Sequence, residues 1–301
     1  MKYLITIFIF CIVLFLYLHI QFHLKTSSDL EIYTIEQPSK EKLEEICDLR
    51  QPVLVDYTID NIMENCNLSI LDDNYGAFDI KLRDVKNKDN NSEMHLPFLF
   101  KEAINLFQKD ENKKFITENN EDFLEETGVM KHYKYNDEFL RPYLVSKCMY
   151  DIWSGSTGSC TPLRYHLNYR NYLYVTSGKV RIKLIPPHYS KYLSIYKDYE
   201  NSEYRSPIDP WNVQTEYKAE FGKVKVLDVD LYPGTLLFIP AYWNYSLCYD
   251  EISSITVFQY RTYMNTVAVL PDLLMGVLQK QNVHKKNVKK MDNNVENKKI
   301  D

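Results

Sequence analysis

The chain has 301 residues, 45% of them hydrophobic and 14% aromatic, which is enough to bury a substantial core in one domain with additions. Its formal net charge of -5 argues against a general nucleic-acid binder, so we expect no nucleic-acid partner. Its six cysteines have spacings that match no zinc ribbon.

The first predicted element is an apolar run over residues 3–20. A helix of roughly 17 to 25 such residues crosses a bilayer, and we predict that residues 1–24 are a transmembrane signal anchor binding the chain to a membrane. A cleaved signal peptide would have a shorter apolar stretch and small residues at its cleavage site, and a buried core helix is a further alternative. Lys2 and the amino terminus favour a cytosolic N-terminus, which predicts a single-pass type II protein of an endomembrane or the plasma membrane.

Residues 25–140 are predicted to form a flank of helices and strands. Ser39 is placed to cap a helix through Leu49, and Pro52–Tyr57 is typical of a strand. Apolar residues at helical spacing predict another helix over Pro97–Phe107.

Residues 141–265 are predicted to form the β core. Tyr172–Thr176 and Val180–Ile185 are short strand candidates, and Ser177-Gly178 between them predicts a hairpin turn. Glu251–Tyr263 alternates as a further strand.

Two segments outside these strands have open interpretations. Residues 189–217 contain six tyrosines and are expected to run over the mouth of the core, either as a partner-binding surface or packed on their own barrel. Residues 266–301 are predicted to form a helix beginning near Pro271, followed by a disordered, lysine-rich tail.

A set of short motifs in the core carries a resemblance to a known family. In chain order they are Thr161-Pro162-Leu163, Asn171, Ser177-Gly178-Lys179, Arg181, Leu184, Pro186-Pro187, Pro233-Gly234, Leu237-Phe238-Ile239-Pro240 and Trp243. This order resembles the cupin-like branch of the jumonji C (JmjC) hydroxylases, with a weaker similarity extending from about Glu41 to Tyr263. The resemblance implies a mostly β (α+β) fold, a double-stranded β-helix with flanking helices. It also implies dependence on Fe(II) and 2-oxoglutarate, hydroxylation or demethylation of protein or RNA, and a homodimer through the C-terminal helix.

The metal ligands of that family fall on other residue types here. The family's His-x-Asp pair aligns with Arg164 and His166, and its distal His aligns with Tyr245. Arginine offers no lone pair and stays protonated, and a neutral phenol with a pKa near 10 is a weak ligand. We therefore predict no cofactor and a catalytically inactive pseudo-oxygenase that acts in binding or structure.

A shifted alignment is the alternative. It places His166 and Asn168 as a His-x-Asn pair, which predicts an Fe(II)- and 2-oxoglutarate-dependent hydroxylase or demethylase with non-standard ligands. Asparagine is neutral and replaces a carboxylate poorly.

Two interpretations of Arg164 remain open. It is either an ordinary polar residue on a barrel strand, or a fixed cation that fills the metal position and binds an anionic small molecule. The family's cosubstrate threonine aligns with Thr161, but the expected lysine aligns with Val180. Our candidate ligand or cosubstrate pocket consists of Thr161, Asn171, Lys179, Lys183 and Trp243.

Overall fold

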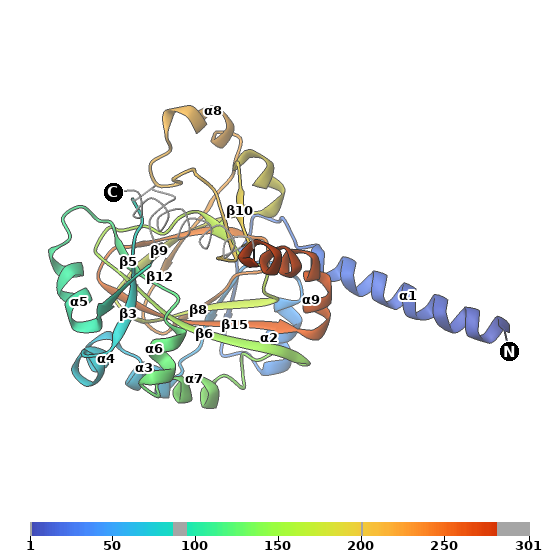
Figure 1. The fold of residues 1–301 in the computed structure, drawn as a ribbon, viewed down its shortest axis with the longest axis horizontal. Coiled ribbons are helices and arrows are strands. Elements are labelled where there is room, and N and C mark those ends of the chain that lie inside the picture. The colour runs from blue at the N-terminus through green and yellow to red at the C-terminus, as the bar shows by residue number, and fades with distance from the viewer. Residues whose placement is uncertain (1, 87–94, 200, 282–301) are drawn as a thin grey trace, which may run out of the picture.

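Two β-sheets face each other in the computed structural model, which describes residues 2–86, 95–199 and 201–281 (Figure 1). The larger sheet has nine strands, in the spatial order β1 (Tyr33–Glu36), β2 (Val53–Asp56), β13 (Thr235–Phe238), β8 (Arg170–Ser177), β15 (Ser253–Thr262), β6 (Val145–Gly155), β5 (Phe115–Thr117), β3 (Asp79–Asp84) and β4 (Leu96–Leu99). The smaller sheet has six, in the order β10 (Tyr196–Asp198), β11 (Glu203–Arg205), β7 (Arg164–Tyr165), β14 (Asn244–Tyr249), β9 (Val180–Ile185) and β12 (Leu227–Leu231).

Side-chain alternation along β8 gives the larger sheet two buried faces. Leu173 and Val175 point between the sheets, where they pack with Leu237 and other apolar residues. Tyr172 and Tyr174 point to the opposite face, against the helices. The predicted double-stranded β-helix with flanking helices is therefore confirmed.

The helices pack mainly on the outer face of the larger sheet (Figure 1). The α-helices after α1 are α2 (Lys40–Cys47), α3 (Asp60–Asn65), α4 (Leu68–Tyr75), α5 (Phe100–Lys109), α6 (Glu121–Glu126), α7 (Met130–Asn136), α8 (Lys218–Phe221) and α9 (Tyr263–Ala268), with 3-10 turns at Pro187–Tyr192 and Thr215–Tyr217. Helix α8 lies elsewhere, because its Phe221 packs with Leu163 and Ile185 in a separate cluster. Residues 270–281 are also helical. Ser39 caps α2 as predicted, because its side chain accepts a hydrogen bond from the Lys42 amide.

The predicted hairpin at Ser177-Gly178 is wrong. β8 pairs with β13 and β15, whereas β9 pairs with β12 and β14, so the turn carries the chain from one sheet to the other. Gly178 has a φ of 73°, and a Cβ there would lie 2.4 Å from the Ser253 hydroxyl. The turn residue was correctly recognised, but a positive φ serves a corner between sheets as well as a hairpin.

The helix predicted over Pro97–Phe107 begins later than expected. Leu96–Leu99 is strand β4, which pairs with β3, and α5 starts at Phe100. Pairing with a neighbouring strand outweighs the local helical spacing in these four residues. The flank and the core also share one sheet, since β1 to β5 extend the strands that follow residue 141.

The helix α1 (Lys2–Leu24) projects away from the barrel (Figure 1). Among the described residues it is the one helix that is long and apolar enough to span a membrane, and none of its apolar window is buried. Only its last turns pack on the body, where it contacts α9. The lysine-rich tail predicted beyond residue 281 lies outside the described residues.

Candidate functional site

Arg164 occupies the interior between the two sheets. Strand β7 lies between β11 and β14, and Arg164 is the register partner of Tyr245. Its side chain is 5% exposed, and its guanidinium carbon lies 5.1 Å from the centre of the Trp153 ring. The two sequence positions that align with metal ligands, 164 and 245, are thus brought together inside the barrel.

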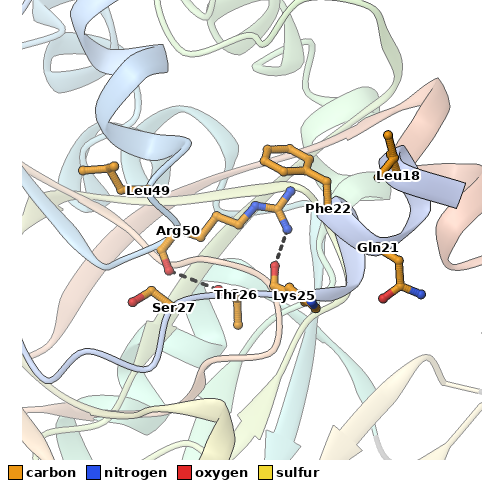
Figure 2. A pocket seen from close by; sticks show the side chains of 8 residues that line it. All are labelled: Leu18, Gln21, Phe22, Lys25, Thr26, Ser27, Leu49 and Arg50. Carbon is orange, nitrogen blue, oxygen red and sulfur yellow. Dashed lines mark hydrogen bonds between the residues drawn. The ribbon is translucent and has the colours of Figure 1, made fainter. Parts of the chain in front are cut away.

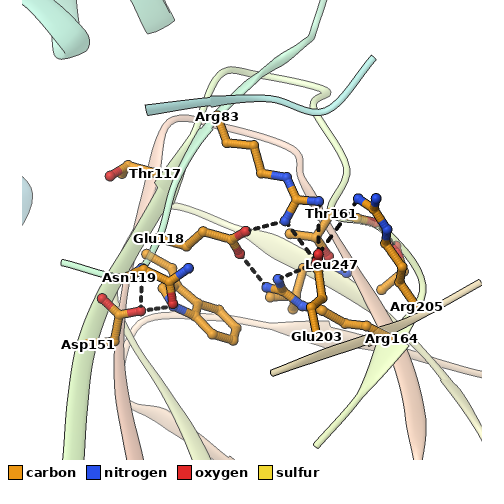
Figure 3. A network of polar contacts seen from close by, with 12 residues as sticks. Arg83, Thr117, Glu118, Asn119, Asp151, Thr161, Arg164, Glu203, Arg205 and Leu247 are labelled. Atoms are coloured by element: carbon orange, nitrogen blue, oxygen red, sulfur yellow. Dashed lines mark hydrogen bonds and ion pairs between the residues drawn. The ribbon is translucent and has the colours of Figure 1, made fainter. Parts of the chain in front are cut away.

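Two carboxylates surround this guanidinium (Figure 3). Arg164 Nη2 donates to Glu118 at 2.5 Å, and Nη1 donates to Glu203 at 3.4 Å. Arg83 donates to the same two carboxylates, at 2.6 Å to Glu118 and 2.8 Å to Glu203. These four residues form the buried ion-pair network, and Arg205 adds a longer contact of 3.7 Å to Glu203 at its edge.

The electrostatics of the network show a mutual dependence. Burial alone would raise the pKa of Glu118, but Arg164 and Arg83 hold that pKa well below its usual value. Burial likewise opposes the charge on Arg164, and Glu118 restores it, so the pKa of the guanidinium lies above its usual value. Glu118 and Arg164 therefore hold each other in the ionised state. Both buried arginines face the same two carboxylates, so little of their positive charge is left for an anionic ligand.

His166 lies next to the network and is tied to the third aligned position. Its Nε2 lies 2.5 Å from the Tyr245 hydroxyl, within hydrogen-bond distance. Burial, with the nearby charge of Arg164, lowers the pKa of His166 to about 3. The imidazole is neutral at physiological pH and shares a hydrogen bond with a phenol whose own pKa burial raises.

The shifted His-x-Asn alignment places Asn168 as the second ligand, but its amide has other partners. The Asn168 oxygen accepts a hydrogen bond from Arg261 at 2.7 Å, and its nitrogen donates to Gln259 at 3.0 Å. An amide held in this way next to a cation does not form a metal face with His166.

The residues present do not fit an Fe(II) ion. A facial triad offers two imidazoles and a carboxylate, whereas the interior offers a guanidinium, one imidazole and a phenol bonded to that imidazole. Glu118 is the nearest carboxylate, and it is saturated by Arg83 and Arg164. Within residues 2–86, 95–199 and 201–281, no three histidine, cysteine, aspartate or glutamate side chains are grouped to hold a metal.

Three members of the candidate pocket have structural partners. The Thr161 hydroxyl accepts a hydrogen bond from the Leu247 amide, and Asn171 donates to the carbonyls of Asn168 and Ile239. The Trp243 indole donates to the carbonyl of Ser27, fastening the segment after α1 to the core.

Lys179 and Lys183 lie on the other side of the smaller sheet. Lys179 pairs with Asp230 at 2.9 Å, and Lys183 lies 3.7 Å from Asp228 and over the ring of Trp211. The inward positions of β9 are taken by apolar residues such as Leu184. The structure therefore does not bring either lysine to Arg164, because neighbours on a strand point to opposite faces.

Sequence reasoning missed the carboxylates that pair with Arg164. Glu118 follows β5 and Glu203 opens β11, far from Arg164 in the chain, and no motif surrounds either of them. The available signal was indirect, since an inward-facing arginine requires buried anions. A disulfide between Cys160 and Cys248, which also went unrecognised, joins the approach to β7 with β14.

The tyrosine-rich segment packs largely on its own barrel. Tyr204 is buried and stacks on Tyr165 with ring centres 5.0 Å apart, and Tyr199 contacts Tyr204 edge-on. Of its six tyrosines, only Tyr196 is more than half exposed. This leaves little of the segment as an aromatic surface for a partner.

Comparison with known proteins agrees with this architecture. Residues 38–260 match the model of the cupin-like domain family, and the chain belongs to that family. It is JmjC-like, and active proteins of this kind are generally 2-oxoglutarate-dependent oxygenases.

Part of the chain is similar to curated proteins named HSPB1-associated protein 1. The bovine and human proteins are each 30% identical over 107 residues, which are 35% of this chain and 22% of theirs. The rat protein is 31% identical over 93 residues, 31% of this chain and 19% of its own length. The chain thus matches about a fifth of these relatives.

Proposed function

We propose that this protein is a membrane-anchored pseudo-oxygenase, a cupin-like barrel that binds a protein partner and does not carry out iron-dependent hydroxylation. The observation that carries the proposal is the pairing of Arg164 with Glu118 and Glu203, since Arg164 aligns with a metal ligand of the active family members. A divalent cation entering there would meet a fixed positive charge and two carboxylates that are already neutralised.

The same pairing supports a protein partner over an anionic small molecule, the two partners considered for this chain. A small anion would have to displace Glu118 or Glu203 from Arg164, and the displaced carboxylate would lose one of its two buried arginine partners, keeping only Arg83. Binding to a protein surface needs no such exchange. The curated relatives bear a name that states an association with another protein, and this supports a binding role for the shared domain.

We propose helix 270–281 as the contact surface. Leu273 and Gly276 pack it onto the barrel, Leu273 among buried tyrosines and Gly276 against the Tyr199 carbonyl. The opposite face exposes Leu274 and Leu278, 53% and 54% accessible. Exposed apolar residues on one face of a helix are typical of an interaction site, including that of a second copy of the chain.

Metal loading and turnover test the loss of catalysis. Purified full-length protein is incubated anaerobically with Fe(II), desalted and assayed for bound iron, and succinate release from 2-oxoglutarate is followed in air. We expect far less than one iron per chain and no succinate above a protein-free control. Stoichiometric iron with succinate release would overturn the proposal, and loss of that iron in His166→Ala would identify the imidazole as its ligand.

The contact surface is tested by measuring the molar mass of the protein by light scattering as it elutes from a size-exclusion column. If the wild-type chain forms dimers, Leu274→Asp with Leu278→Asp should convert them to monomers. Leu96→Asp, at a similarly exposed leucine on β4, is the matched control.

A further inference from the structure

Where α1 joins the body, a hollow of about 370 Å³ lies between the last turns of α1 and the loop after α2 (Figure 2). Its walls combine two kinds of side chain. Leu18, Phe22 and Leu49 form an apolar part that is 43% to 56% exposed, and Lys25 and Arg50 form a positively charged part. This volume lies in the range of small-ligand sites.

Arg50 is the unusual member of this lining. It is 8% exposed, and it is one of four buried arginines among the described residues. Arg83, Arg164 and Arg170 each lie within 3.4 Å of at least one carboxylate oxygen. No carboxylate in the described ranges forms an ion pair with Arg50, which donates instead to the Lys25 carbonyl at 2.5 Å.

The other N–H donors of Arg50 lack hydrogen-bond partners. Its Nε and Nη2 are buried and have no hydrogen-bond partner, while the Phe22 ring covers the guanidinium at 4.0 Å. Burial lowers the pKa of Arg50, and the neighbouring charge of Arg170 adds to this effect. An uncompensated cation in such a place is costly unless an anion approaches it.

The backbone at Arg50 has a positive φ, which it shares with seven other non-glycine residues of the described ranges. Its φ is 59°, in the left-handed region that follows many helices and that usually belongs to glycine. A residue with a Cβ is strained in this conformation, and such strain tends to persist where a side chain has a function.

From these observations we propose that the hollow binds a membrane phospholipid. The phosphate lies at the charged wall, contacting exposed Lys25 within the field of Arg50, and an acyl chain lies along Leu18 and Phe22 toward the exposed face of α1. The arrangement places the phosphate just past the apolar run of α1, at the depth where lipid headgroups lie. This inference depends on α1 spanning a bilayer and is independent of iron binding.

Native mass spectrometry of the full-length chain in an uncharged maltoside detergent tests the site. The probes are dioleoyl phosphatidylglycerol, dioleoyl phosphatidylcholine and dioleoylglycerol, which share acyl chains but differ in the phosphate. We expect one retained phospholipid per chain and about tenfold weaker retention of dioleoylglycerol, because it cannot form charge-assisted bonds.

Two variants separate lipid binding from a purely structural role of Arg50. Arg50→Gln and Lys25→Gln should each weaken phospholipid retention about threefold, whereas Arg181→Gln, on the far side of the barrel, should not. Lys25 is exposed, so its replacement is not expected to disturb folding.

Three results would overturn the proposal. Equal retention of dioleoylglycerol would show that only the acyl chains are held. Wild-type retention by Lys25→Gln would show that the charged wall does not hold the phosphate. Binding of inorganic phosphate alone, at millimolar concentration and without lipid, would identify a site for small anions instead.

Discussion

Arg164 and Arg50 are both buried arginines, yet they lie in opposite electrostatic settings. Arg164 shares two carboxylates with Arg83 at the centre of the barrel. Arg50, at the root of α1, has a backbone carbonyl and an aromatic ring as its partners. The charge of Arg164 is balanced by carboxylates of the protein itself, whereas Arg50 has no carboxylate partner and lines a hollow.

This difference shows why a buried positive charge does not by itself indicate an anion site. What matters is whether carboxylates within the protein already neutralise the charge. The presence or absence of carboxylate partners also predicts how each region responds to mutation. Removing a carboxylate from the ion-pair network leaves a buried arginine without its counter-charge, whereas Arg50 has no carboxylate partner to lose.

The largest effect is expected for Glu118→Gln. It leaves Arg83 and Arg164 to share Glu203 in the buried interior, so the free energy of unfolding should fall by about 3 to 5 kcal/mol. Urea unfolding followed by tryptophan fluorescence measures this loss. Glu220→Gln is the control, since Glu220 is about half exposed on α8, and its effect should stay below about 1 kcal/mol. A similarly small effect of Glu118→Gln would contradict the view of a closed, mutually dependent network.

The disulfide gives a second way to probe the closed region. Cys160 and Cys248 are 88 residues apart, and Cys248 lies on the strand that carries Tyr245. Cys248→Ser should lower the free energy of unfolding by about 2 to 4 kcal/mol, chiefly by releasing a long loop in the unfolded chain. Cys148→Ser, at a free cysteine, is the matched control.

Alkylation of free thiols in protein taken directly from cells tests whether this disulfide forms in the cell. Blocked thiols at Cys160 and Cys248 would support a body on the oxidising side of the membrane, as the type II topology requires. Full labelling of both residues in that material would argue for a cytosolic body.

A smaller effect is expected from pH acting on His166. Its pKa is lowered to about 3 in the folded state, while the unfolded chain titrates near 6.5. The unfolded state therefore binds the proton first, and stability is lost as pH falls below about 6.5. Between pH 7 and pH 5 this group should cost about 2 kcal/mol. In His166→Gln the difference between unfolding free energies at these two pH values should shrink by that amount, and an unchanged difference would refute the assignment.

The residue pattern was sufficient to predict strands of a β core, and the resemblance to the JmjC family supplied the double-stranded β-helix. Val180–Ile185 appears in the structure at the predicted bounds, and helix α2 begins after the predicted Ser39 cap. The connection between strands β8 and β9 could not be predicted from this pattern. Gly178 permits a hairpin and a corner equally, and only the pairing of distant strands decides between them.

The candidate site was predictable in part for a related reason. The alignment placed Arg164, His166 and Tyr245 at equivalent positions, and the structure brings Tyr245 into contact with both others. Their partners were not predictable, because Glu118 and Glu203 come from strands whose neighbours are set by the whole fold. Lys179 and Lys183 are a further example. They are close in sequence to inward-facing residues of β9, but they point outward and pair there with aspartates that the sequence pattern did not indicate.

The smallest effect on stability is expected at Arg50, where it tests the contrast with Arg164 directly. Arg50→Gly removes the hydrogen bond to the Lys25 carbonyl and the contact with Phe22, but it leaves no carboxylate without a partner. It also relieves a positive φ of 59°, which glycine adopts without strain. These terms nearly cancel, so the free energy of unfolding should stay within about 1 kcal/mol of wild type.

Arg50→Ala is the matched variant, since it loses the same contacts and keeps the strained backbone. It should be less stable than Arg50→Gly by about 1 kcal/mol, which urea unfolding of the two proteins side by side resolves. A loss of 3 kcal/mol or more in Arg50→Gly would mean that Arg50 has a buried partner after all. In that case Arg50 would be as closed a site as Arg164, and the hollow beside it would carry no free charge for a phosphate.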